Sequence, residues 1–412
     1  MPRIKTISQN IAVFVGQVPA TGYHVTGGAG FTGTNSVGLI KPLVGVTAVD
    51  YSWSQAKQDV ITYGKMASRD RVAIDPPEVP MNITYYLGAG YNEHVLGLYV
   101  QNQRATGSGV DSYSLENTAL KHFLDRSKDE RNFFVMIAPE GADADNLEGS
   151  ATTQVIGIGN GFVNSYSVEG SVGNFPSVTV GVQGLNIKSY TAGTGLLPAV
   201  NPTTGLEITN KGFFYLPNSA VLGYGEAGFE PFVLRPGDIS LNLSTAGGIF
   251  HNDFNTPDVQ SFSVNFDLSR QPINKLGSRF STSREMTFPI NVNFEVSMLA
   301  KDLKTDSLAD FLCQTGKHHA TITMKYNDCG GAGSGAFKID LRNISLESQN
   351  WSTQAGSEPQ TCSLTWLGQI GATGDTVNGL FLSGFGAGGY TGITSAARTG
   401  LPPATVIAKT VA

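Results

Sequence analysis

Two stretches of this chain align with each other without a gap, and this internal repeat constrains the fold more than any other feature. "VDYSWSQAKQDVITYG" begins at Val49, and "FSVNFDLSRQPINKLG" begins at Phe262. Each opens with apolar residues at every second position, continues with a basic residue followed by Gln, and ends on a glycine. Alternation with a period of two is typical of a β-strand with one buried face. We therefore expect the same strand and turn to occur twice.

The similarity continues beyond the two glycines. "TALKHFLDRSKDERNFFVM" from Thr118 matches "DSLADFLCQTGKHHATITM" from Asp306, and this match sets Phe134 against Ile322. Further on, "GFVNSYSVEGSVGNFPSVTVGVQG" resembles "NISLESQNWSTQAGSEPQTCSLTWLG", since in both a strand, a loop with Gly and Pro, and a second alternating strand follow one another. Two strands, a helix, a third strand and a β-hairpin are thus expected twice in the same order.

A short helix is expected within each repeat. Apolar residues at i, i+3 and i+4 predict a helix with one apolar face, and Thr118 and Asp306 are suitable N-cap residues. The residues expected to be buried on these faces are Leu120, Phe123 and Leu124 in the first repeat, and Leu308, Phe311 and Leu312 in the second. A short helix of this kind packs most simply over an open end or edge of a barrel or sandwich.

Length and composition agree with a β-rich chain of two domains. The chain has 412 residues, of which 50 are glycine and only 15% are charged, and this length exceeds the usual size of one domain. The predicted fold class is mainly β, with two tandem β-barrel or sandwich domains that each carry a short flanking α-helix. The predicted boundaries are 1–190 for the first domain, 191–233 for a connector, 234–385 for the second domain and 386–412 for a C-terminal arm that becomes ordered against a neighbour.

No catalytic, cofactor-binding or metal-binding residue is predicted, and we expect the chain not to be an enzyme. "GIGNG" (157–161) is followed by a strand, whereas a phosphate-binding loop needs a helix. Cys313, His318, His319 and Cys329 lack a standard zinc spacing, and adjacent histidines on a strand point to opposite faces. "DADN" lacks the glycine and the distal Glu of a calcium loop.

Charge and hydropathy exclude further classes. A net charge of −6 argues against a general binder of the nucleic-acid backbone. The N-terminal sequence has no secretory apolar region, and no run of 18 apolar residues occurs, so we expect no membrane insertion. The three cysteines are an odd number without a framework spacing, which indicates reduced thiols and synthesis in a cytosol.

With these features, the sequence resembles the tail tube protein family of tailed bacteriophages, in the long form that carries two tube domains in one chain. The resemblance rests on "SFSVNFDLSRQPINKLGSRFSTSREMTFPINVNFEVSML", on "DSLADFLC", and on "GFVNSYSVEGSVGNFPSVTVGVQGLNI"; it is weak in 1–45, 191–233 and 386–412. It implies subunits joined into rings around a β-lined channel, and rings stacked into a tube through which DNA passes. The first repeat departs from the pattern by the insertion "GAGYNEHVLGLYVQNQRATGSGVDSYS", which leaves open whether both domains play the same part.

The resemblance implies a structural virion protein that self-assembles into the phage tail tube, the conduit for DNA ejection into the host cell. Single-domain members of the family close rings with six copies, so a chain with two domains implies a trimeric ring with pseudo-sixfold symmetry. The implied partners are further copies of the chain, the tail terminator, the baseplate or tip, the tape measure and, as an open question, a sheath. DNA would pass transiently along an acidic or neutral wall, which repels phosphate, although −6 is also an ordinary charge for this length.

The implied location is the phage tail within the virion, after synthesis in the bacterial cytoplasm. Two other functions stay open at this point. One is a tube-initiating or distal tail ring protein, and the other is a β-rich protein that binds carbohydrate or a surface. A glycosidase would need two positioned carboxylates, and no such pair is marked in the sequence.

Overall fold

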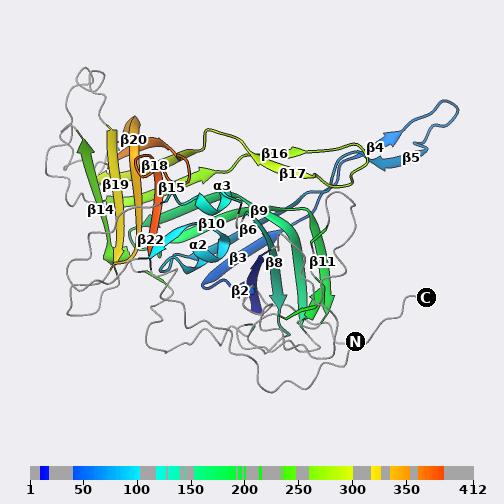
Figure 1. Cartoon of the computed structure of the whole chain (residues 1–412), viewed down its shortest axis with the longest axis horizontal. Helices are drawn as coiled ribbons and strands as arrows, with labels where there is room; N and C mark the ends of the chain where they lie inside the picture. The colour runs from blue at the N-terminus through cyan, green and yellow to red at the C-terminus, as the bar shows by residue number, and fades with distance from the viewer. Residues whose placement is uncertain are drawn as a thin grey trace.

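Antiparallel strands make up most of the described residues in the computed structural model, which confirms the predicted mainly β fold class (Figure 1). The α-helices of the described part are the short α2 (Tyr91–Leu96) and α3 (Lys121–Leu124). The structure describes residues 10–17, 40–102, 117–126, 129–139, 144, 153–191, 194–196, 199–200, 213–215, 233–234, 236–246, 259–299, 317–325, 335–352 and 361–384.

The first repeat contains two linked sheets. Its strands are β1 (Ile11–Gln17), β2 (Ile40–Pro42), β3 (Val46–Tyr51), β4 (Lys57–Val60), β5 (Asp70–Ala73), β6 (Val79–Tyr86), β7 (Val100–Asn102), β8 (Glu130–Ile137), β9 (Gln154–Ser171), β10 (Ser177–Gly184) and β11 (Asn186–Thr191). One half of the long strand β9 belongs to the sheet β3-β6-β10-β9, and the other half pairs with β8 and β11. β8 in turn pairs with β1, and β4 with β5 forms a separate hairpin.

The second repeat has the same pairing pattern. Its strands are β14 (Ile239–Ala246), β15 (Val259–Asp267), β16 (Arg270–Ile273), β17 (Ser283–Met286), β18 (Asn291–Leu299), β19 (Lys317–Lys325), β20 (Gly335–Ser352), β21 (Thr361–Gln369) and β22 (Gly379–Gly384). Here β15-β18-β21-β20 is one sheet, the rest of β20 pairs with β19 and β22, β19 pairs with β14, and β16 with β17 is the hairpin. Between the repeats lie the small hairpin of β12 (Thr194–Leu196) and β13 (Phe213–Tyr215) and the 3-10 helix η5 (Pro236–Asp238).

Individual backbone features recur at equivalent places. Gly64 and Gly277, at the tips of the two hairpins, have φ angles of 87° and 84°, which favour glycine. Asn160 and Asn343, within the two long strands, have φ angles of 50° and 58°. The duplication inferred from the sequence is thus visible in the strand order. Since strands of both repeats join one sheet, the point where one domain ends and the next begins stays a prediction.

The structure corrects the alignment of the third strand by one residue. Phe133 on β8 and Ala320 on β19 occupy equivalent places in the main core. Phe134 instead belongs to a small separate cluster on the other face, whereas Ile322 lies in the main core. The match of Phe134 with Ile322 is therefore wrong, because a slip of one residue exchanges the faces of a strand.

The helix of the first repeat is present but shorter and differently capped than predicted. Leu120 and Phe123 are fully buried, and Leu124 packs against the core from a partly exposed position. The predicted N-cap role of Thr118 is wrong: Leu120 occupies the N-cap position, and the Thr118 hydroxyl is buried without a hydrogen-bond partner. The second helix stays a prediction, because Asp306, Leu308, Phe311 and Leu312 lie outside the described residues.

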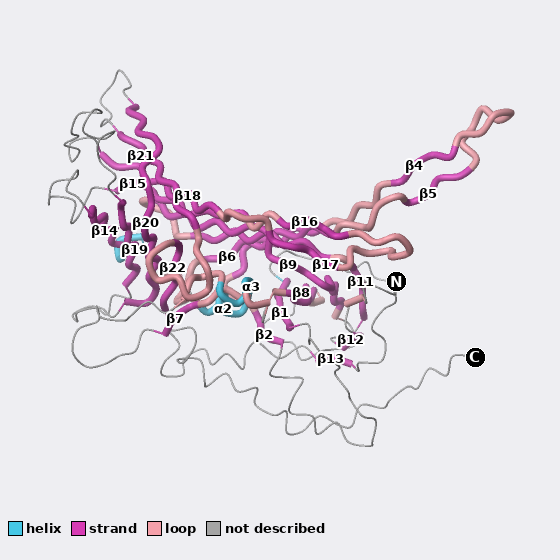
Figure 2. The backbone as a smooth tube through the Cα atoms, turned by 45° about the horizontal axis from the view of Figure 1, so that its top comes forward, coloured by secondary structure: helices cyan, strands magenta, loops and turns pink. Residues whose placement is uncertain are grey.

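The insertion of the first repeat places a carboxyl group in the core. It forms α2, which lies against one face of the long sheet together with α3 (Figure 2). Glu93 on α2 is fully buried, and its Oε1 accepts hydrogen bonds from the hydroxyls of Tyr85 (2.9 Å) and Tyr166 (3.3 Å). Burial raises the pKa of Glu93 to about 7, because an apolar environment disfavours the charged form.

Replacing Glu93 with Gln should remove a pH dependence of stability. The pKa rises from 4.5 to about 7 on folding, so the folded chain keeps a proton that the unfolded chain releases between these values. The stability contributed by the protonated group is complete below about pH 4.5 and is lost as the pH rises through 7. We expect Glu93→Gln to exceed the wild type in unfolding free energy at pH 8 by about 3 kcal/mol, measured by urea denaturation.

The matched control is Glu169→Gln on the exposed part of β9. Because this side chain is exposed, its replacement should change the unfolding free energy at pH 8 by less than about 0.5 kcal/mol. Identical pH curves for Glu93→Gln and the wild type would contradict the assignment of a protonated Glu93 in the folded chain.

Candidate functional site: the joint between the repeats and the polar sheet face

A strand pairing joins the two repeats into one sheet. β9 pairs antiparallel with β15, from Ser171 opposite Ser261 to Ser165 opposite Asp267. The sheet therefore runs in the order β3-β6-β10-β9-β15-β18-β21-β20. Such a joint uses main-chain donors and acceptors, which every strand carries along its edge.

The core side of the joint is dry and close-packed. Val168 of β9 lies opposite Val264 of β15, and their exposed fractions are 0% and 1%. Next to this pair, the rings of Tyr166 and Phe266 stack with centroids 5.3 Å apart. Because these side chains come from both repeats, the two repeats share one apolar core.

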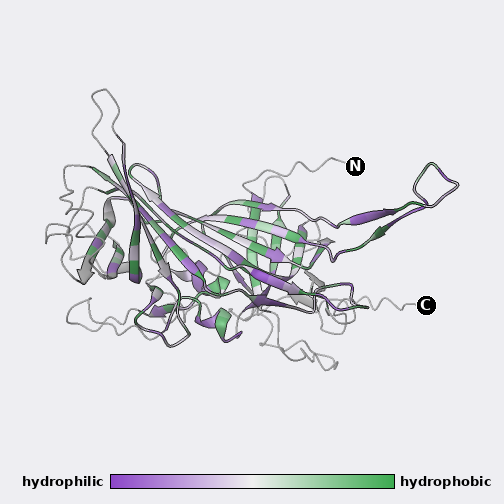
Figure 3. Cartoon of the chain, turned by 90° about the horizontal axis from the view of Figure 1, so that it is seen from above, coloured by the Kyte–Doolittle hydropathy of each residue, from purple (hydrophilic) through white to green (hydrophobic). Residues whose placement is uncertain are grey.

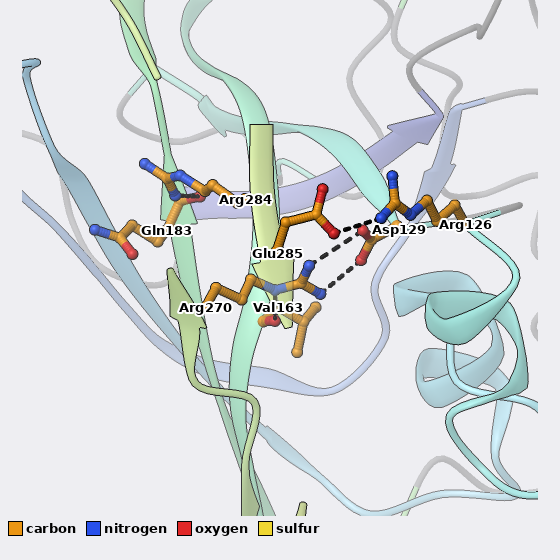
Figure 4. Close-up of polar contacts among 7 residues, drawn as sticks. All are labelled: Arg126, Asp129, Val163, Gln183, Arg270, Arg284 and Glu285. Carbon is orange, nitrogen blue, oxygen red and sulfur yellow. Dashed lines mark hydrogen bonds and ion pairs between the residues drawn. The ribbon is translucent and has the colours of Figure 1, made fainter. Parts of the chain in front are cut away.

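The hairpin β16–β17 extends from the second repeat across the first and is held there by a buried ion pair (Figure 4). Arg270 donates two hydrogen bonds to Asp129, of 3.1 Å and 2.5 Å, and a third of 3.2 Å from Nε to the carbonyl of Val163. The side chains of Arg270 and Asp129 are only 3% and 12% exposed. A bidentate arginine–carboxylate pair of this kind fixes the relative orientation of the two side chains as well as their contact.

A second arginine of the hairpin contacts the same surface. Arg284 donates a 3.0 Å hydrogen bond to the carbonyl of Gln183, and both Arg270 and Arg284 lie over the ring of Phe162, at 5.1 Å and 5.5 Å. Burial lowers the pKa of the Arg284 guanidinium from its usual value. At the rim, Arg126 and Glu285 form an ion pair of 2.5 Å whose side chains are 68% and 42% exposed.

The sheet face opposite the core is polar and lacks basic residues on its central strands. Side chains of a strand alternate between its two faces, and hydrophilic and hydrophobic residues alternate along the strands, as the bands of colour in Figure 3 show. The residues on the polar face are Ser165, Ser167 and Glu169 on β9; Ser261, Ser263, Asn265 and Asp267 on β15; Asn291, Asn293, Glu295 and Ser297 on β18; and Thr361, Ser363 and Thr365 on β21. All charges at these positions are carboxylates, so the face offers phosphate groups hydroxyls and amides but no cation.

The two ends of this sheet present unpaired edges in the described part of the chain. β3 pairs only with β6, and the outer half of β20 pairs only with β21. Trp53 after β3 is 63% exposed, whereas its equivalent, Phe266, is 2% exposed. Trp351 on β20 is 44% exposed, whereas its equivalent, Val168, is 0% exposed. Positions that are buried where β9 pairs with β15 are thus exposed at the two outer edges of the sheet.

The structure places the residues of the rejected metal and phosphate motifs at the following positions. Residues 157–161 lie within β9, where the backbone is irregular at Asn160, and the strand that the sequence predicted after them is confirmed. His318 and His319 are adjacent on β19, and burial lowers the pKa of each imidazole. Cys313 and Cys329 lie outside the described residues. Within the described ranges, no group of three His, Cys, Asp or Glu side chains could hold a metal ion, and no helix is long and apolar enough to cross a membrane.

The partners of the hairpin could not be predicted from the sequence. Arg270 was visible as the basic residue of the repeated stretch, and Arg71 and Arg284 stand at equivalent positions. Asp129 carried no signal, because it belongs to a different repeat and precedes a strand, so only folding brings it beside Arg270.

The structural likeness of this chain to known proteins is weak. No protein family model and no curated protein matches the chain. Among solved structures, it is similar to a chain in the cryo-EM structure of the anti-feeding prophage (AFP) baseplate, 6-fold symmetrised, with a TM-score of 0.24 and 9% sequence identity. The match covers 36% of this chain and 93% of that chain. A likeness at this level does not indicate a shared function.

The two ion pairs of the hairpin should differ in their energetic importance. Replacing Arg270 with Gln leaves the Asp129 carboxylate buried without its cation, which should lower the unfolding free energy by about 3 kcal/mol. Replacing Arg126 with Gln is the matched control, because its pair with Glu285 is exposed, and should cost less than about 1 kcal/mol. Urea denaturation at neutral pH measures both. Equal losses in the two variants would show that the buried pair does not hold the hairpin.

Proposed function

We propose that this protein is a structural, non-enzymatic component of a phage tail, and that copies of it join edge to edge into a ring that encloses a channel for DNA. The observation that carries the proposal is the pairing of β9 with β15 inside the chain, together with the edges of β3 and β20, which are unpaired among the described residues. The joint shows how the edge of one repeat meets the next repeat. The free edge of β3 corresponds to the edge of β15, and the free edge of β20 corresponds to the edge of β9. In the described part of the chain, neither free edge has a partner strand.

The internal joint predicts the register of the joint between chains. Transferred to the equivalent strands, the register of β9 with β15 sets Trp351 of one chain opposite Tyr51 of the next, and Gln349 opposite Trp53. The exposed indole rings would then become buried, as their equivalents are in the internal joint. An unpaired edge with exposed apolar side chains readily adds another strand.

Repetition of the joint leads to a closed ring. A contact between two different surfaces of the same chain generates a ring when its rotation closes on itself. If the joint between chains has the geometry of the internal joint, each chain contributes two similar segments to the wall. Combined with the resemblance to the tail tube family, this supports three chains per ring with pseudo-sixfold symmetry.

The polar sheet face is suited to the inside of such a ring. The helices α2 and α3 pack on the core side of the sheet, which leaves the other face for the channel. Proteins that hold DNA do so with Lys and Arg, whose phosphate contacts release counterions. A wall of hydroxyls, amides and carboxylates offers no such contact, so DNA would pass without being retained. Stacked rings would form the tail tube of the virion and would contact other tail proteins at the tube ends.

A proline at the free edge of β3 should block ring formation without unfolding the chain. The N–H groups of Ser52 and Ser54 donate inward to Pro80 and Glu78, so the N–H of Trp53 points to the free edge. Trp53→Pro removes that donor and places the pyrrolidine ring of proline where the neighbouring strand would pair. We expect normal circular dichroism and no rings in negative-stain electron microscopy. Trp53→Thr keeps the N–H and should still form rings, and rings from Trp53→Pro would refute the edge-to-edge joint.

The number of chains per ring can be measured directly. We expect the native mass of an isolated ring to correspond to three chains, and end-on views to show six similar lobes that alternate in detail. Six chains per ring would contradict the trimer. One repeat lying wholly outside the channel wall would contradict the equal role of the two repeats.

A further inference from the structure

The two equivalent hairpins differ in what they contact. In the second repeat, Ser281 and Arg284 on β17 and the loop before it are 5% and 9% exposed, because the hairpin lies against the first repeat. The equivalent residues Ser68 and Arg71 are exposed, and the Arg71 side chain is 69% accessible. Figure 1 shows the hairpin β4–β5 extending beyond the body of the molecule. Among the described residues, the same structural element is thus docked in one repeat and has no protein surface beneath it in the other.

We propose that the hairpin β4–β5 is a docking arm that lies across the second repeat of a second copy of this chain. This inference rests on the proposed function, since the copy that receives the arm is the one whose β20 pairs with β3. The hairpin β16–β17 shows the geometry: it follows β15 directly and lies across the repeat that contributes β9. The hairpin β4–β5 follows β3 in the same way.

Asp129 accepts two of the three hydrogen bonds of Arg270, but the corresponding sequence position of the second repeat is Gly316, so this ion pair is not reproduced between chains. The remaining acceptors of the arm are main-chain carbonyls, which do not depend on the side chains present. Arg270 and Arg284 donate to the carbonyls of Val163 and Gln183. The equivalent donors are Lys57 and Arg71, and the equivalent acceptors are the carbonyls of Leu346 and Leu367. The Leu367 carbonyl accepts a 3.2 Å hydrogen bond from a side chain, the Ser345 hydroxyl, and Arg71 of the arm would take the place of that donor. The first hairpin thus has a basic residue, Lys57 or Arg71, at each of the two positions from which the second hairpin donates to a carbonyl.

Other basic residues of the first hairpin are not basic in the second. A specific docking contact can therefore be distinguished from a general effect of positive charge. Lys65 and Arg69 of the first hairpin stand where the second has Ser278 and Thr282. The hydroxyl of Thr282 bonds back to its own hairpin, at Ile273. Lys65 and Arg69 thus have no basic counterpart on the docked hairpin, and they serve as a control of equal charge.

The docking between chains is expected to be weaker than the docking within the chain. Phe162, over which both arginines lie, is replaced by Ser345, and Glu285 of the exposed ion pair is replaced by Val72. In the free chain, Arg71 contacts Asp59 of its own hairpin at 3.5 Å, and both side chains are more than half exposed. Exposed pairs of this kind are weak, so Arg71 can exchange Asp59 for the neighbouring chain during assembly.

Cross-linking between two singly substituted chains tests the contact. Chains with Arg71→Cys are mixed with chains with Ser345→Cys, assembled, and treated with a short bismaleimide. We expect a covalent dimer in the mixture and none from either variant alone, which also controls for the native cysteines. Moving the second cysteine to Ser363, on the polar sheet face, should abolish the cross-link. Rings in the mixture without a cross-linked dimer would overturn the docking arm while leaving the ring itself in place.

A second comparison measures the contribution of the two donors. We expect Lys57→Gln with Arg71→Gln to raise the protein concentration needed for assembly by about tenfold or more, which corresponds to about one charged hydrogen bond. Lys65→Gln with Arg69→Gln removes the same charge and should leave that concentration unchanged. Equal effects of the two double variants would overturn the specific contact. Absence of rings from the wild type would instead refute the proposed function, so the two failures are distinguishable.

Discussion

The edge of a β-strand must find partners for its main-chain N–H and C=O groups, and this requirement organises the whole chain. Within the chain it is met by the pairing of β9 with β15, which turns two repeats into one sheet with one core. Every other feature of the joint follows from that pairing. The stacked rings of Tyr166 and Phe266 fill its core side, and the hairpin with Arg270 covers the adjoining surface.

The long strands make this arrangement possible because each belongs to two sheets. β9 pairs with β8 and β11 along one half and with β10 and β15 along the other. Asn160 and Asn343, with their positive φ angles, lie where the two long strands change partners. Asn and Asp tolerate this conformation better than most residues. The Asn160 side chain also accepts a hydrogen bond from the N–H of Val200 and bonds to Glu130, which holds the irregular backbone in place.

Local features of the fold could be predicted from the sequence, and contacts between distant segments could not. The gap-free match that includes Val49 and Phe262 correctly predicted equivalent strands, because alternation of apolar residues is a local property. The register of β8 was mispredicted because both of its faces are buried and apolar, so Phe133 and Phe134 look alike in sequence. Thr118 was wrongly predicted as an N-cap, because the sequence does not show that this threonine is buried and lies before the first turn of the helix. The pair of Arg270 with Asp129 depends on the docking of one repeat on the other, for which a single sequence carries no signal.

The presence of both repeats in one chain has a mechanical consequence. In a ring built as proposed, outward pressure would pull neighbouring strands apart and load each joint across its hydrogen bonds. At the joint of β9 with β15, the covalent connector holds the two sides together even when the hydrogen bonds open, so they can close again. At the joint of β20 with β3, separated chains diffuse apart. Rupture of the wall would therefore begin at every second joint, and the duplication would halve the number of places at which the wall can fail.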